Sequence, residues 1–185
     1  MRNPPTILIT LIALIAFAGN SLLCRAALRD TAIDAGSFTA VRIVSGALAL
    51  CLIVVLRSKN DTDRQGSGNW RSALALFVYA ATFSFAYVEM ASGTGALLLF
   101  GAVQATMIGA GLWRGEKFGA AQSVGLGIAG TGLITLLFPG LSAPPLHSAL
   151  LMLLSGIAWG IYSLRGQGAG DPTRVTTGNF VRAAV

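Results

Sequence analysis

Two polar residues lie inside long apolar segments, where their side chains could bind a solute. Arg42 lies in the first turns of an apolar stretch at 37–56, and Gln104 lies at the centre of another at 94–113. An arginine inside a membrane span costs roughly 2.5–3.5 kcal/mol on insertion scales unless it meets water or a partner. Arg42 is therefore predicted either to face an anion or a gate, or to extend its charge to the nearby end of its stretch. The amide of Gln104 needs a hydrogen-bond partner, which is either a substrate or a neighbouring helix.

Aromatic residues at helical spacing form a second set of candidates for a binding site. Three share one face of a segment and two lie in a later one: Tyr79, Phe83 and Tyr87 at 72–88, and Trp159 and Tyr162 at 148–164. Rings around a cavity near the membrane midplane would suit apolar or aromatic solutes. Core packing and anchoring at the membrane interface are the structural alternative. The predicted cavity residues are Arg42, Tyr87, Gln104, Trp159, Asn20 and Tyr162.

Catalytic and metal-binding chemistry find no support in the sequence. The single histidine, His147, and the two cysteines, Cys24 and Cys51, lack the spacing of a zinc or redox site. The seven acidic residues are scattered mainly in polar stretches, so no nucleophile and base can be paired. The glycines of 125–130 match a dinucleotide fingerprint, but no strand precedes them and no acidic residue follows within 40 positions. We predict no enzyme activity, no cofactor and no metal.

The composition is that of a membrane protein. Of the 185 residues, 54% are hydrophobic and 11% are charged, whereas about a quarter of a soluble domain is charged. No charged residue occurs between Lys117 and Arg165, a stretch long enough to cross a bilayer twice. The net charge of +6 comes mostly from loops rather than from one basic patch, so the predicted partner is the lipid bilayer and not nucleic acid.

The apolar runs predict an all-α, polytopic bundle of about six spans. These are 6–23, 37–56, 72–88, 94–113, 118–138 and 148–164. A last apolar piece from Val175 to Val185 is long enough for only about 16 Å of helix, so we expect a seventh span to be started and the chain to be truncated. The first run also fits a cleavable signal peptide, but the later spans predict a membrane protein in either case.

The basic residues predict the orientation of these spans. Nine fall on one side of the membrane: Arg2, Arg57, Lys59, Arg64, Arg71, Arg114, Lys117, Arg165 and Arg174. Only Arg25 and Arg29, in a polar hinge after the first span, fall on the other side. Because cytoplasmic loops are enriched in Lys and Arg, we predict that the N-terminus is cytoplasmic.

Small residues at helical spacing predict close contacts between spans. The candidates are Gly101, Ala105 and Gly109 in the fourth span, Gly125 and Gly132 in the fifth, and Gly156 and Gly160 in the sixth.

A weak internal repeat links the two ends of the chain. Residues 15–22 correspond to 157–164 at five positions, and Val41-Arg42 recurs as Val181-Arg182. The repeat unit would then hold five spans. An odd number makes the second copy enter the membrane from the opposite side, as in many secondary transporters that bind substrate near the midplane and rock one repeat against the other.

The order of these features resembles the EamA-type members of the drug/metabolite transporter superfamily. The resemblance rests on Phe38 to Arg42, Gly93 through Gln104 to Met107, Gly115-Glu116, the glycine-rich fifth span and Ala158-Trp159-Gly160. It implies ten helices in two inverted five-helix repeats around a central cavity, here residues 1–140 and the incomplete 146–185. It also implies export or exchange of amino acids, other metabolites or drugs. The chain departs from that plan by ending early in the second repeat.

We therefore expect a secondary transporter for a small-molecule substrate, with a proton or counter-solute as the candidate coupled species and a homodimer as the candidate assembly. The alternative is a non-transporting membrane subunit, or an inactive fragment, whose glycine faces dock partner helices.

Overall fold

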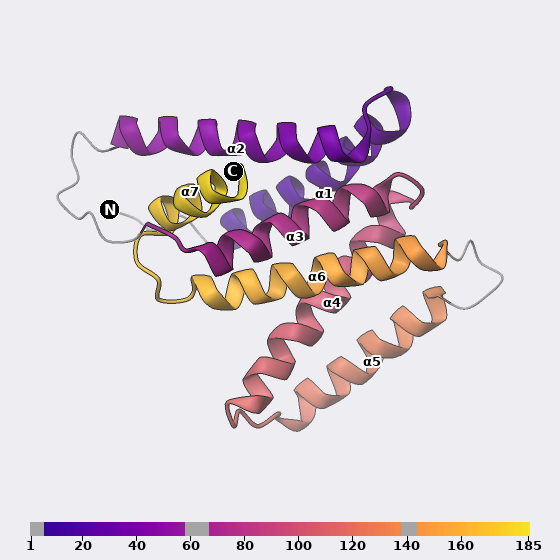
Figure 1. Cartoon of the computed structure of the whole chain (residues 1–185). Coiled ribbons are helices and arrows are strands. Elements are labelled where there is room, and N and C mark those ends of the chain that lie inside the picture. Colours follow the sequence, from indigo (N-terminus) through magenta and orange to yellow (C-terminus); the bar gives the residue numbers. More distant parts are fainter. Residues whose placement is uncertain (1–5, 58–66, 138–143) are drawn as a thin grey trace.

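The computed structural model describes residues 6–57, 67–137 and 144–185, and these form seven α-helices and no strand (Figure 1). The helices are α1 (Thr6–Asp30), α2 (Ala35–Arg57), α3 (Trp70–Tyr87), α4 (Ser92–Trp113), α5 (Ala120–Leu137), α6 (Leu146–Gly166) and α7 (Pro172–Ala183). The all-α prediction is confirmed. Three predicted features lie wholly or partly outside the described residues: the end of the fifth span at Phe138, the repeat limit at residue 140, and much of the charged loop 57–71.

Four of the described helices, α1, α2, α4 and α6, are long and apolar enough to cross a membrane. Their outer faces carry exposed aliphatic side chains, for example Ile7 and Leu23 on α1 and Leu52 on α2. Large contiguous apolar surfaces of this kind are unfavourable in water. The helices are therefore compatible with a membrane location.

The first helix is longer than the sequence pattern predicted. It continues through Arg25 and Arg29 to Asp30, so the predicted polar hinge after residue 23 is helical for most of its length. The reason is local: this stretch holds alanine and leucine, which favour helix, and neither glycine nor proline. Leu28 is buried, so packing also stabilises the extra turns.

Aspartates begin two of the later helices. The backbone N–H of Ser37 donates to Oδ1 of Asp34 over 2.9 Å at the start of α2, and the N–H of Arg174 donates to Asp171 over 2.8 Å at the start of α7. Such caps satisfy backbone donors that a helix leaves free. The Ser37 hydrogen bonds hold the pKa of Asp34 below its ordinary value, so this cap stabilises α2 at neutral pH and is lost only in acid.

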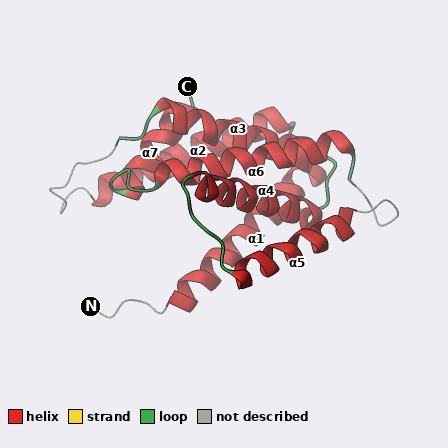
Figure 2. Ribbon diagram, turned by 90° about the horizontal axis from the view of Figure 1, so that it is seen from below, coloured by secondary structure: helices red, strands yellow, loops and turns green. Residues whose placement is uncertain are grey.

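The core of the bundle is built on α6. This helix packs along α3 and α4, while α7 packs between α2 and α3 (Figures 1 and 2). Helix α1 makes lighter contacts with α3 and α4, and only Ser21, Cys24 and Leu28 of its 25 residues are buried. Helix α5 packs mainly against α4 and diverges from the other helices (Figure 1).

Two glycines permit the contact between α6 and α4. A Cβ on Gly156 would lie 2.5 Å from the carbonyl oxygen of Leu99 and 2.6 Å from the Cβ of Ala102, and one on Gly160 would lie 2.8 Å from the Cβ of Thr106. No side chain larger than hydrogen fits there, which is how small residues bring membrane helices together.

Three of the other predicted packing glycines make no such contact in the described part of the chain. A Cβ on Gly109, Gly125 or Gly132 would meet no atom within 4 Å, Ala105 is exposed, and Gly101 is half-buried. The reason is the outward course of α5, which leaves its own glycines and the end of α4 uncovered.

We expect Gly156→Ala to lower the free energy of unfolding by about 1–3 kcal/mol, because the added methyl group overpacks the contact with α4. Gly125→Ala is the matched control, since it lies in a helix with open space around it and alanine favours helix. Thermal unfolding followed by circular dichroism in detergent micelles would measure both. Equal melting temperatures for Gly156→Ala and the unaltered chain would contradict the close contact.

Candidate functional site

Tyr79, in the middle of α3, lies at the centre of the candidate site. The Ser155 hydroxyl of α6 donates to the Tyr79 carbonyl oxygen over 3.1 Å, which fixes the two helices side by side. Trp159 follows Ser155 by four residues and so lies on the same face of α6. Its ring centroid is 4.6 Å from that of Tyr79.

Five aromatic rings continue this contact into an aromatic column. In spatial order they are Tyr162, Trp159, Tyr79, Phe83 and Tyr87, with successive centroid separations of 5.4, 4.6, 5.5 and 4.6 Å. Residues 79, 83 and 87 are spaced by four on α3, and 159 and 162 are spaced by three on α6, so each helix presents its rings on one face. The column therefore follows the seam between α3 and α6.

Arg42 of α2 reaches this column. Its Nη2 donates to the Tyr79 hydroxyl over 3.0 Å, and its guanidinium carbon lies 4.7 Å from the Phe83 ring centroid and 5.4 Å from the Tyr79 centroid. Such cation–π contacts contribute about 0.5–2 kcal/mol each. The guanidinium thus points into the bundle and not toward the end of its helix.

One nitrogen of this guanidinium has no acceptor. Nη1 of Arg42 is buried and makes no hydrogen bond within the described ranges, which makes it a donor available to a ligand. No carboxylate of the described residues forms an ion pair with Arg42 either, because the ion pairs found there are Arg29–Asp30 and His147–Glu89.

A small cavity lies beside Tyr79 and Trp159. Its walls come from four helices: Phe17, Asn20 and Ser21 of α1, Tyr79 of α3, Leu99 and Phe100 of α4, and Trp159 of α6. Its volume of about 10 Å³ is enough for roughly one water molecule. Asn20 and Trp159, both predicted cavity residues, therefore do share a cavity.

The two ends of the aromatic column are held by polar contacts that the sequence did not reveal. The hydroxyl of Tyr162 accepts from Nδ2 of Asn179 over 3.4 Å, and Oδ1 of Asn179 accepts from the backbone N–H of Asn69 over 2.9 Å. Asn179 is buried on α7, so it joins this helix to the start of α3. The sequence feature that could have indicated this contact is Asn179 itself, a polar residue within the last predicted apolar segment.

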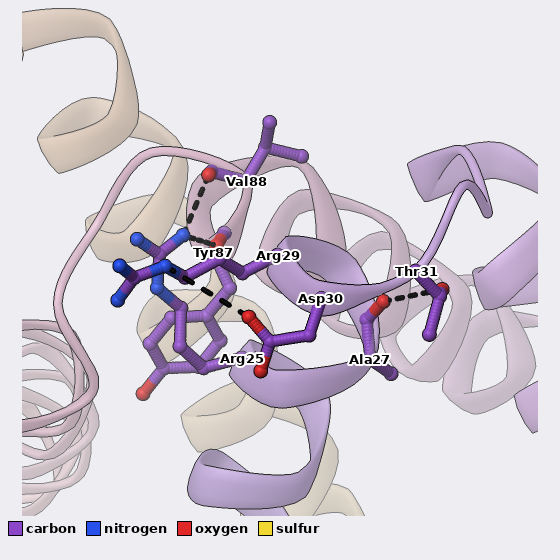
Figure 3. Close-up of polar contacts among 7 residues, drawn as sticks. All are labelled: Arg25, Ala27, Arg29, Asp30, Thr31, Tyr87 and Val88. Carbon is purple, nitrogen blue, oxygen red and sulfur yellow. Dashed lines mark hydrogen bonds and ion pairs between the residues drawn. The ribbon is translucent and has the colours of Figure 1, made fainter.

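Arg25 holds the other end (Figure 3). Its Nη1 donates to the carbonyl oxygens of Tyr87 and Val88 over 2.7 and 2.6 Å. These carbonyls end α3 and lack partners within that helix. Tyr87 itself is fully buried, and its hydroxyl donates to the Ser92 carbonyl oxygen over 3.2 Å. Arg25 therefore joins α1 to the turn between α3 and α4.

Gln104 is the predicted site residue that the structure separates from the others. It is exposed on α4 and does not line the cavity formed by Asn20 and Trp159. Leu99 and Phe100 supply the cavity wall from α4 instead.

Glu89 pairs with the beginning of α6. Its Oε2 lies 2.8 Å from Nε2 of His147, and the Ser148 hydroxyl donates to the same oxygen over 3.4 Å. Both ionisable side chains are about half-exposed or more, and exposed pairs of this kind contribute little to stability. Glu89 thus serves as a contact between the α3–α4 turn and α6.

We expect Arg25→Gln to lower the free energy of unfolding by about 2 kcal/mol, because charged hydrogen-bond donors contribute about 1.5–3 kcal/mol. Arg29→Gln is the matched control, since its pair with Asp30 spans 3.9 Å between exposed side chains (Figure 3). Denaturation in mixed micelles would measure both. A loss for Arg29→Gln as large as for Arg25→Gln would contradict the assigned role of Arg25.

Comparison with known proteins gives one informative match. The chain is 61% identical over 183 residues to a protein of Pseudomonas aeruginosa described as "Uncharacterized protein PA1977". The match covers 99% of this chain and 63% of that relative, so the chain spans less than two thirds of the relative's length. No protein-family model and no solved structure matches the chain.

Proposed function

We propose that this chain acts as a secondary carrier for small organic solutes in the bacterial inner membrane. The observation that carries the proposal is the contact of Arg42 with Tyr79 and of Tyr79 with Trp159. These residues come from three helices and lie far apart in sequence. A half-buried arginine and stacked aromatic rings inside an apolar helix bundle suit the binding of a solute better than they suit packing alone.

The proposed architecture is that of an EamA-type drug/metabolite transporter. In it α1 to α6 are the six spans, α7 begins the seventh, and the repeats are residues 1–140 and 146–185. The packing supports this plan, because α1 and α2 of the first repeat and α6 and α7 of the second all contact α3. Access would alternate as one repeat rocks against the other, coupled to a proton or a counter-solute.

The proposed orientation has a cytoplasmic N-terminus, which puts the α1–α2 turn outside and the start of α3 inside. Single cysteines at the exposed positions Ala32 and Ser67 would test it in a chain whose Cys24 and Cys51 are replaced by serine. We expect a membrane-impermeant maleimide to label Ala32→Cys in intact spheroplasts and to label Ser67→Cys only after lysis. The reverse pattern would overturn the orientation.

Solute counterflow in proteoliposomes would test the carrier itself. We expect flux of at least one solute from a panel of amino acids, aromatic acids and amphiphilic drugs. Because the chain spans 63% of the length of the Pseudomonas relative, both proteins should be assayed side by side. Absence of flux from both across the panel would refute a carrier function.

Arg42→Gln should reduce that flux at least roughly tenfold, because it removes the charge and the donor that a solute would meet. Arg57→Gln is the matched control: Arg57 lies on the same helix and donates to the Thr173 hydroxyl over 2.8 Å, away from the aromatic column. Equal flux from the two variants would remove Arg42 from the proposed site.

A second candidate is a non-transporting subunit whose uncovered glycines dock a partner helix or a second copy of the chain. The observation in its favour is the open space beside Gly125, Gly127, Gly130 and Gly132 on α5. Co-purification of a partner at fixed stoichiometry, or a crosslinked homodimer, combined with no flux would favour this candidate over the carrier.

A further inference from the structure

The guanidinium of Arg42 leaves one direction open for a ligand. Tyr79 accepts from Nη2, and the rings of Phe83 and Tyr79 contact the guanidinium. A stacked guanidinium keeps its N–H groups directed outward in its own plane, where they match the two oxygens of a carboxylate. Nη1 is the buried group in this plane without an acceptor in the described part of the chain.

The charge of the site favours a ligand with a single negative charge. The acidic residues in the described ranges fall at the ends of helices or between them, and none of them pairs with Arg42. An unpaired cation among apolar helices is unfavourable, and one anionic group would neutralise it. A phosphate monoester would carry nearly two charges into a site with one cation.

The surroundings of Arg42 favour a ligand that has an aromatic ring and no amino group. Tyr79, Phe83 and Trp159 offer ring faces and edges for stacking. An ammonium group would be repelled by the Arg42 guanidinium, and the described contacts around Arg42 include no carboxylate that would offset this repulsion. We infer that the site selects aromatic monocarboxylates, with the carboxylate on Arg42 and the ring against Tyr79 and Trp159. This inference rests on the proposed solute site.

The conformation described is closed to such a ligand. The cavity beside Tyr79 and Trp159 holds roughly one water molecule, and Phe17, Asn20 and Ser21 of α1 form one wall. The ligand enters when α1 withdraws from the aromatic column. Light packing makes α1 the helix that can do so, because its buried residues begin only at Ser21.

Tryptophan fluorescence can follow binding without transport. The chain has three tryptophans, of which Trp70 is 65% and Trp113 is 93% exposed. Replacing both with phenylalanine leaves Trp159 as the reporter in the aromatic column. The protein, reconstituted in vesicles, is titrated with 3-phenylpropionate, with its uncharged analogue 3-phenylpropionamide, with phenylalanine and with inorganic phosphate.

We expect 3-phenylpropionate to change the Trp159 emission saturably, and the amide and phenylalanine to require at least roughly tenfold higher concentrations. Phosphate should neither change the emission nor compete. In Arg42→Gln the preference for the acid over the amide should disappear, whereas Arg57→Gln should retain it. The comparison of acid with amide uses the unaltered Arg42, so it does not depend on the folding of that variant.

Equal affinity for acid and amide, competition by phosphate, or an unchanged preference in Arg42→Gln would each overturn the inference. Selective binding of 3-phenylpropionate without flux in the counterflow assay would instead support the ligand class and refute the carrier. The two proposals can therefore fail separately.

Discussion

The placement of one guanidinium among apolar helices is the constraint on which the candidate site depends. A charge at the centre of a membrane-spanning helix costs roughly 2.5–3.5 kcal/mol on insertion scales, and contacts such as those of Arg42 with Tyr79 and Phe83 offset part of such a cost. The Ser155 hydroxyl of α6 donates to the backbone carbonyl oxygen of Tyr79, which joins α6 to α3 at the same residue. Gly156, the neighbour of Ser155, lets the same turn of α6 lie against the backbone of α4 at Leu99. Polar recognition and close helix packing are therefore parts of one arrangement.

Helix type, and the face on which the rings lie, could be predicted from the sequence because both follow from local spacing. The four-residue interval between Tyr79, Phe83 and Tyr87 was sufficient to predict that the three rings share one face of a helix. In the structure these rings form part of the aromatic column. The partner of that face could not be predicted, since it depends on which helix approaches α3. In the structure that helix is α6, whose Ser155 hydroxyl donates to the Tyr79 carbonyl oxygen, and the spacing of residues along α3 alone does not predict this contact.

The surroundings that the sequence did not predict have the same origin. Gln104 lies at the centre of an apolar helix, but α4 turns it outward because its contacts with α6 involve other residues. Arg25 looked like a residue of a polar hinge, whereas its side chain satisfies two carbonyl oxygens at the end of α3. In both positions the sequence identified a polar residue but not its surroundings, because these depend on tertiary contacts. The contact of Arg25, for example, is with residues more than 50 positions away in the sequence.

The contact of Arg25 also determines which part of α1 is held most firmly. It fastens α1 to the α3–α4 turn near one end, and the buried residues of α1 all lie in that same half, while the half that begins at Thr6 packs against little. A rod fixed at one end swings about that end. In the opening inferred above, the displacement of α1 would be smallest beside Tyr87 and would grow toward Thr6, so Phe17 would move farther from the cavity than Ser21. The α3–α4 turn would then act as the hinge about which α1 rotates away from the rest of the bundle.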